Sequence, residues 1–166
     1  VIVCDMWDRH WCSSAQHRVQ EMAPRVDRFL RALRKRGVFI IHAPSDTMSF
    51  YAGTPQRKCA QQARSLGEKR FPHLRGWYGW DATREPPLPI DDSDGGCDAP
   101  GVGKPSRVWT RENPAIWIAP QDAVSDSGPE IFGLLAQRQI RHVLILGVHL
   151  NMCVLGRPFG IRQLVT

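Results

Sequence analysis

The stretch that decides the fold is Val1-Ile2-Val3-Cys4-Asp5, at the start of the 166-residue chain. Its continuous apolar run is typical of a strand that is buried on both faces, as in a parallel sheet. A charged group directly after a core strand costs free energy unless it is paired or functional. Asp5 is therefore a candidate site residue, and the alternative is an Asp that caps a loop.

A helix and a second strand are expected next. Pro24 suits the first turn of a helix, and Gly37 suits its end. Apolar residues recur between them at helical spacing, at Val26, Phe29, Leu30 and Leu33. Ser13 and Ser14 could cap a shorter helix before it, and residues 38–41 form the next buried apolar run. Strand, helix and strand in this order predict a right-handed parallel crossover.

The second half of the chain continues this alternation. Short strands are expected at residues 108–110 and 142–146, with an extended piece at 115–118. Ser127 and Glu130 have the spacing of a capping box that opens a helix, and a final helix is expected to begin near Asn151. The pattern predicts the α/β class, a three-layer α/β/α sandwich with a mostly parallel sheet. We expect one domain over residues 1–166, cut at both ends.

Residues 43–106 break the periodicity and are rich in Pro, Gly, Asp and Trp. Such a long irregular insertion is usually a functional lid or is disordered. The aromatic residues Trp77, Tyr78 and Trp80 favour packing. We expect them to lie near the carboxyl edge of the sheet and to wall a pocket there.

Composition limits the partners. The net charge is +6 with a pI near 9.4, yet the arginines are scattered and no basic run alternates with aromatic residues. A solvated basic surface is therefore expected, and nucleic-acid binding rests on net charge alone. No apolar run approaches the roughly 20 residues of a membrane helix, so no membrane partner is expected.

The cysteine count also has consequences. There are five cysteines, an odd number, with no C-x-x-C pair, which argues against a disulfide framework and a zinc ribbon. Reduced thiols are expected. Unpaired cysteines favour the cytoplasm, although localisation is otherwise not readable from the sequence.

Cys153 is the sharpest chemical candidate. It follows a buried strand and a glycine-containing turn, where the first turn of a helix is expected. The amides and dipole of that turn would lower the pKa of its thiol and hold a developing oxyanion. Cys153 should then be the thiol that is alkylated fastest, and the alternative is a buried apolar cysteine. Arg111, at the end of residues 108–110, could supply a nearby cation or be an ordinary surface arginine.

Two motifs carry a resemblance to a known family. Gly147-Val148-His149-Leu150-Asn151-Met152-Cys153-Val154 closely resembles the nucleophile motif of the isochorismatase-like cysteine hydrolases, which include nicotinamidases and N-carbamoyl amide hydrolases. The stretch from Val1 to Trp7 resembles the first strand of that family with its Asp. The resemblance covers both ends of the chain and the core elements between them, but not residues 43–106.

The resemblance implies an Asp, Lys, Cys triad. Asp5 and Cys153 match it, whereas Arg111 stands where the family usually carries Lys, and an arginine cannot trade protons as a lysine can. Lys104 is the fallback cation. The resemblance also implies a cis peptide between Val148 and His149, with the amides of His149 and Cys153 forming the oxyanion hole.

The implied reaction is hydrolysis of a C–N bond in a small amide or carbamoyl compound through a thioester. Trp7 and Asn151, which lie in the two motifs, are expected to contact the substrate. No cofactor is expected. The protein is expected to form a homo-oligomer.

A metal site is not expected either. Some members of the family bind a metal near the second strand, but His42, Asp46 and the aspartates of the insertion match no ligand set.

Beside nucleic-acid binding, which rests on net charge alone, two alternatives to this function stay open. One is a non-catalytic binding or assembly module of the same fold, which the loss of Lys at Arg111 supports. The other is vinyl-ether hydrolysis of the isochorismatase type, against which Cys153 argues.

Overall fold

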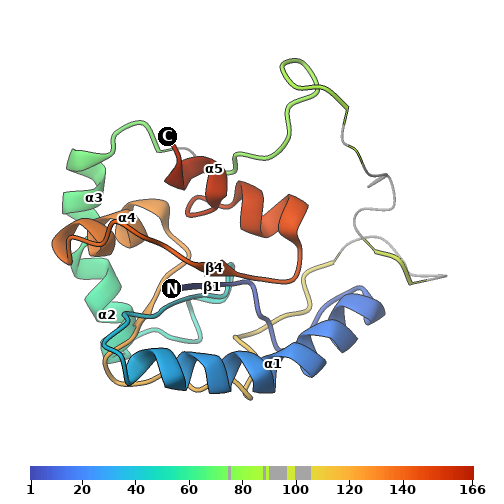
Figure 1. Ribbon diagram of the computed structural model, residues 1–166, viewed down its shortest axis with the longest axis horizontal. Coiled ribbons are helices and arrows are strands. Elements are labelled where there is room, and N and C mark those ends of the chain that lie inside the picture. The colour runs from blue at the N-terminus through green and yellow to red at the C-terminus, as the bar shows by residue number, and fades with distance from the viewer. Residues whose placement is uncertain (75, 88, 90–96, 100–105) are drawn as a thin grey trace.

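A small parallel sheet organises the molecule in the computed structural model, which describes residues 1–74, 76–87, 89, 97–99 and 106–166 (Figure 1). Its strands are β1 (Ile2–Cys4), β2 (Ile41–Ala43), β3 (Ala123–Val124) and β4 (Ile145–Leu146), in the order β3-β2-β1-β4. All three pairings are parallel, and Ile2 lies opposite Ile41 on one side and Ile145 on the other. The predicted α/β class with a parallel sheet is confirmed.

Five α-helices accompany the sheet in the described residues: α1 (Ser13–Arg34), α2 (Pro55–Gln62), α3 (Arg64–Arg70), α4 (Gly128–Gln137) and α5 (Ile161–Leu164). A one-turn π-helix, Leu150–Val154, follows β4. No helix among these residues is both long and apolar enough to cross a bilayer.

Helices cover both faces of the sheet because successive side chains of β1 point to opposite sides. Val3 packs in a cluster with Val19, Ala23 and Leu30 of α1. Ile2 and Cys4 pack in another cluster, with residues of α2, α4 and the C-terminal segment. Figure 1 accordingly shows α1 on one side of the strands and α5 on the other. The continuous apolar run of β1 is explained by burial on both faces.

The first helix is longer than predicted. It begins at Ser13 and continues through Pro24, so the two helices expected on either side of this proline are one. Its buried residues Ala15, Val19, Ala23 and Leu30 mark a single face against the sheet. Packing of that face outweighs the loss of one backbone donor at Pro24.

The insertion is not irregular throughout, which corrects the prediction for residues 43–106. It contains α2 and α3, two short polar helices whose buried residues are Ala60 and Gly67. Thr54 caps α2, since its side chain accepts a hydrogen bond from the amide of Arg57 at 3.3 Å, and Pro55 occupies the first turn. This Thr-Pro signal was available in the sequence.

The expected strand at residues 108–110 and the extended piece at 115–118 are not strands in the structure. Glu112 instead forms an isolated antiparallel bridge with Trp7. Ser127 is the N-cap of α4, but its side chain makes no capping bond. Glu130 instead pairs with Arg57 and accepts a hydrogen bond from Ser125. The predicted capping box is therefore wrong, although its helix is present.

Close backbone approach joins α3 to α4. A Cβ added to Gly133 would lie 2.0 Å from the carbonyl oxygen of Ala63, and one added to Gly67 would lie 1.8 Å from that of Pro129. The two glycines lower helix propensity, yet they allow these helices to touch.

We predict that Gly133→Ala lowers the free energy of unfolding by roughly 1–3 kcal/mol, because the added methyl group must displace backbone atoms. Urea denaturation of the native and variant proteins measures this. Gly76→Ala is the control, since nothing lies within 4 Å of the Cβ that it would add. Equal losses in the two variants would contradict the close approach.

A chain of charged groups lies inside the core. His42 is fully buried on β2, with its Nδ1 2.7 Å from Glu112 Oε2 and its Nε2 3.1 Å from Asp122 Oδ2. The first pair is an ion pair by distance, without hydrogen-bond alignment. Arg34 completes the chain, with Nη2 2.6 Å from Asp122 Oδ2.

Charge balance sets the protonation of this buried chain. Burial lowers the pKa of His42, but Glu112 and Asp122 outweigh it and raise the pKa to about 9. His42 is therefore cationic at neutral pH, and together with Arg34 it balances the charges of the two carboxylates.

This raised pKa predicts that stability is lost in alkali. A group whose pKa is raised on folding contributes fully below its unfolded value near 6.5, and the contribution disappears as the pH rises through about 9. His42→Gln should remove roughly 3 kcal/mol of the pH dependence between pH 6 and 10. Urea denaturation across this range tests it, with the exposed His142→Gln as control. Parallel pH profiles for native protein and His42→Gln would contradict the cationic His42.

Candidate active site

Asp5 and Cys153 meet at the carboxyl end of β1. Asp5 follows that strand with φ at 50°, in the left-handed region that few side chains adopt. Its Oδ1 accepts a hydrogen bond from the amide of Ser45 at 2.8 Å. Such backbone strain persists only where surrounding contacts hold it, and it is common at functional sites.

Cys153 lies in the π-helix Leu150–Val154 instead of the expected α-helical first turn. Its thiol is buried, and the charges of Asp5 and Arg157 act on it from close by. Single π-turns are frequent at functional sites. The structure thus brings two sequence-predicted residues together from opposite ends of the chain.

The cation beside them is Arg157. Its Nε donates to Asp5 Oδ2 at 2.7 Å, and its side chain is only 18% exposed. Arg157 stands four residues after Cys153, so one helical turn brings the two side chains to the same face. Sequence reasoning missed it, although this spacing was the available signal.

Arg111, the predicted cation, lies elsewhere. Its guanidinium carbon is 5.3 Å from the ring centroid of Phe50, and its backbone pairs with Asp8. In the described part of the chain Arg111 makes no ion pair. Lys104, the fallback, falls outside the described residues.

A cavity of about 180 Å³ opens beside the thiol, and its walls are mostly aromatic. It is lined by Trp7, His10, Trp11, Trp77, Trp109, His149, Met152, Cys153 and Arg157. The rings of Trp7 and Trp109 stack with centroids 3.9 Å apart and planes 7° apart. Of the two residues expected to contact the substrate, Trp7 lines this cavity and Asn151 does not.

The insertion contributes one wall. Trp77 lines the cavity, as expected for a lid residue, and the amide of Tyr78 donates to the carbonyl of Gly156 at 2.7 Å. Trp80 is not a lining residue, and its indole donates to the carbonyl of Pro86. One of the three predicted aromatic residues thus walls the cavity.

A disulfide between Cys12 and Cys97 ties the insertion to the start of α1. This corrects the expectation that all five thiols are reduced, and it removes the support that unpaired cysteines gave to a cytoplasmic location. Cys4, Cys59 and Cys153 are free. The odd number of cysteines had argued against a disulfide, yet these two cysteines, 85 residues apart, form one.

Two neutral imidazoles border the cavity. Burial, together with the nearby His149, lowers the pKa of His10 to about 4. Burial also lowers the pKa of His149, whose Nε2 is buried without a hydrogen-bond partner among the described residues. His149 can thus offer a ring nitrogen to a bound molecule.

The described residues contain no cis peptide bond, so the cis bond expected between Val148 and His149 is not present. His149 has an extended backbone, with φ −96° and ψ 91°, and caps the π-helix. Nor do the described residues hold a group of three or more His, Cys, Asp or Glu side chains that could bind a metal ion.

The pKa of Cys153 is raised, in contrast to the lowering expected for a thiol at a helix N-terminus. Burial is the largest cause, and the charge of Asp5 adds to it, while Arg157 opposes it. The thiol is therefore protonated in the free protein at neutral pH. Desolvation outweighs the amides of the first turn.

The charges around Cys153 predict opposite shifts in its alkylation profile. Asp5→Asn should move the pH midpoint for iodoacetamide labelling down, because it removes a negative charge. Arg157→Gln should move it up, because it removes the opposing positive charge. Mass-spectrometric mapping of Cys153 against pH measures both.

Arg111→Gln is the matched control for this experiment and should leave the midpoint unchanged. A shifted midpoint with Arg111→Gln and an unchanged one with Arg157→Gln would indicate that Arg111 is the cation beside Cys153.

Comparison with known proteins identifies no relative. No family model matches the chain, and neither a curated protein nor a solved structure matches it.

Proposed function

We propose that this chain is a cysteine hydrolase of the isochorismatase-like superfamily, with the three-layer sandwich of that family, and that it cleaves a C–N bond in a small amide or carbamoyl compound. The observation that carries the proposal is the meeting of Asp5, Cys153 and Arg157 beside an aromatic cavity. The parallel sheet and the two motifs at the ends of the chain also support it.

The proposed reaction begins with proton transfer from the thiol of Cys153 to the carboxylate of Asp5. The sulfur attacks the carbonyl carbon, and the oxyanion is held by the amides of His149 and Cys153. The C–N bond then breaks, and the leaving nitrogen takes the proton from Asp5. Water hydrolyses the resulting thioester, which releases the acid and restores the thiol.

Arg157 has the role that the family gives to lysine in this proposal. Its fixed charge orients Asp5 and stabilises the thiolate, but it does not carry a proton. Proton transfer then runs between Cys153, Asp5 and the leaving nitrogen. This assignment differs from the first expectation, which gave the role to Arg111.

The cavity favours a small, largely uncharged substrate. Its volume of about 180 Å³ and its indole walls suit a compact planar group. The unpartnered Nε2 of His149 can hydrogen-bond with a substrate amide. A non-catalytic module remains the second candidate, favoured by the raised pKa of Cys153 and by the engagement of Asp5 with Arg157.

We predict that the purified protein releases ammonia from at least one member of a panel of primary amides and carbamoyl compounds. Cys153→Ala should reduce that rate by roughly a thousandfold or more, because the nucleophile is removed. Arg157→Gln should also lower the rate, while Arg111→Gln should stay within a few-fold of the native value.

Two measurements separate the candidates. A Cys153 acyl adduct detected by mass spectrometry during turnover supports the thioester. Absence of ammonia release across the panel, with correctly folded protein, would favour the non-catalytic module. Activity that survives Cys153→Ala would overturn the proposal.

A further inference from the structure

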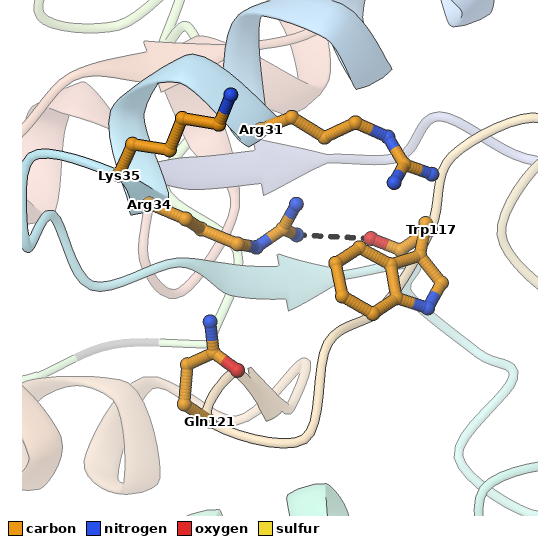
Figure 2. A pocket seen from close by; sticks show the side chains of 5 residues that line it. All are labelled: Arg31, Arg34, Lys35, Trp117 and Gln121. Atoms are coloured by element: carbon orange, nitrogen blue, oxygen red, sulfur yellow. Dashed lines mark hydrogen bonds between the residues drawn. The ribbon is translucent and has the colours of Figure 1, made fainter.

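A second hollow lies apart from Cys153, between the last turn of α1 and the loop that precedes β3 (Figure 2). Its volume is about 440 Å³, and it is lined by Arg31, Arg34, Lys35, Trp117 and Gln121. Three of these five residues are cationic and none is acidic. The hollow therefore offers hydrogen-bond donors beside one large aromatic ring.

Two carboxylates that do not line the hollow hold its two arginines in place. Asp27 accepts from Arg31 Nε at 2.7 Å and from the amide of Trp117 at 2.9 Å. Asp122 accepts from Arg34 Nη2 at 2.6 Å. The guanidinium carbons of the two arginines lie 4.8 and 5.2 Å from the ring centroid of Trp117. This wall is pre-organised, which lowers the entropy lost on binding.

The donors are not fully used. Arg34 Nη1 is buried and has no hydrogen-bond partner among the described residues, although Nη2 donates to the carbonyl of Trp117 at 2.9 Å. Figure 2 shows the Arg34 guanidinium below the side chains of Lys35 and Arg31 and beside Trp117. Lys35 is exposed, and in the described part of the chain it makes no ion pair. An unpartnered buried N–H is unfavourable until an acceptor reaches it.

We propose that this hollow binds a small organic phosphate. The phosphate would lie between Arg31 and Lys35 and supply the acceptor that Arg34 Nη1 lacks, and the organic part would lie against Trp117. A phosphate suits the site because its several oxygens match converging guanidinium and ammonium donors. Half-exposed Trp117 provides the apolar contact, at 45% exposure. The proposal is independent of the chemistry at Cys153.

Calorimetric titration with phenyl phosphate tests this, at constant ionic strength because surface charges are screened by salt. Saturable binding below about 1 mM is expected, with inorganic phosphate binding more weakly because it cannot contact Trp117. Lys35→Ala and Arg31→Ala should each weaken binding roughly tenfold, since each removes a charged donor. Arg34 is left intact because it holds Asp122 in the core.

Lys58→Ala is the matched control. Lys58 is an exposed lysine on α2 outside this hollow, so the variant has the same net charge as Lys35→Ala. It should bind phenyl phosphate within twofold of the native protein. Equal weakening by Lys58→Ala would indicate general charge attraction, and binding that survives both pocket substitutions would put the anion elsewhere. Each of these two results would overturn the proposal. So would the absence of saturable binding, or equal affinity for inorganic phosphate and phenyl phosphate.

Discussion

The carboxylate of Asp5 joins three distant parts of the chain. One oxygen accepts from the amide of Ser45 after β2, and the other accepts from Arg157 after the π-helix. The residue adopts a left-handed backbone to do so. A buried carboxylate needs such partners, because desolvation strongly disfavours an unpaired charge. The contacts that satisfy Asp5 also hold the C-terminal segment against the sheet. The candidate site and the packing of the C-terminal segment therefore depend on the same interactions.

Trp7 connects the surroundings of Asp5 to the buried charged residues of the core. Trp7 donates to the carbonyl of Ser45, stacks on Trp109 and bridges to the backbone of Glu112. Glu112 in turn faces His42, and Asp122 links His42 to Arg34. Burial makes each of these groups unfavourable alone, whereas alternating signs make the set acceptable. The contacts therefore extend from the aromatic cavity at Cys153 to Arg34 beside Trp117, through the buried residues Trp7, Glu112, His42 and Asp122.

The sequence predicts correctly the elements in which burial produces a local pattern of apolar residues. The apolar run before Asp5 gave the central strand, and the strand-helix alternation gave the α/β class. Prediction from the sequence fails where tertiary contacts override local signals. Pro24 lies inside α1 because the buried face of that helix continues through it. The helices α2 and α3 are short and polar, and each buries only one small residue. The family spacing predicted Arg111 as the cation beside Cys153. The actual cation, Arg157, reaches Cys153 because it follows one helical turn later. The Cys12–Cys97 pair joins residues whose proximity only the folded insertion creates.

The raised pKa of Cys153 is compatible with a nucleophilic role once net charge is considered. A protonated thiol, an ionised Asp5 and a cationic Arg157 form a neutral group. Loss of the thiol proton to solvent would leave this buried group with a net negative charge, and burial and Asp5 both oppose that loss. Transfer of the same proton to Asp5 keeps the group neutral, because the thiolate then faces Arg157 while Asp5 is uncharged. A titration of the free protein therefore reports the first process, and the proposed mechanism depends on the second. The arginine is suited to this arrangement because its charge does not change in either step.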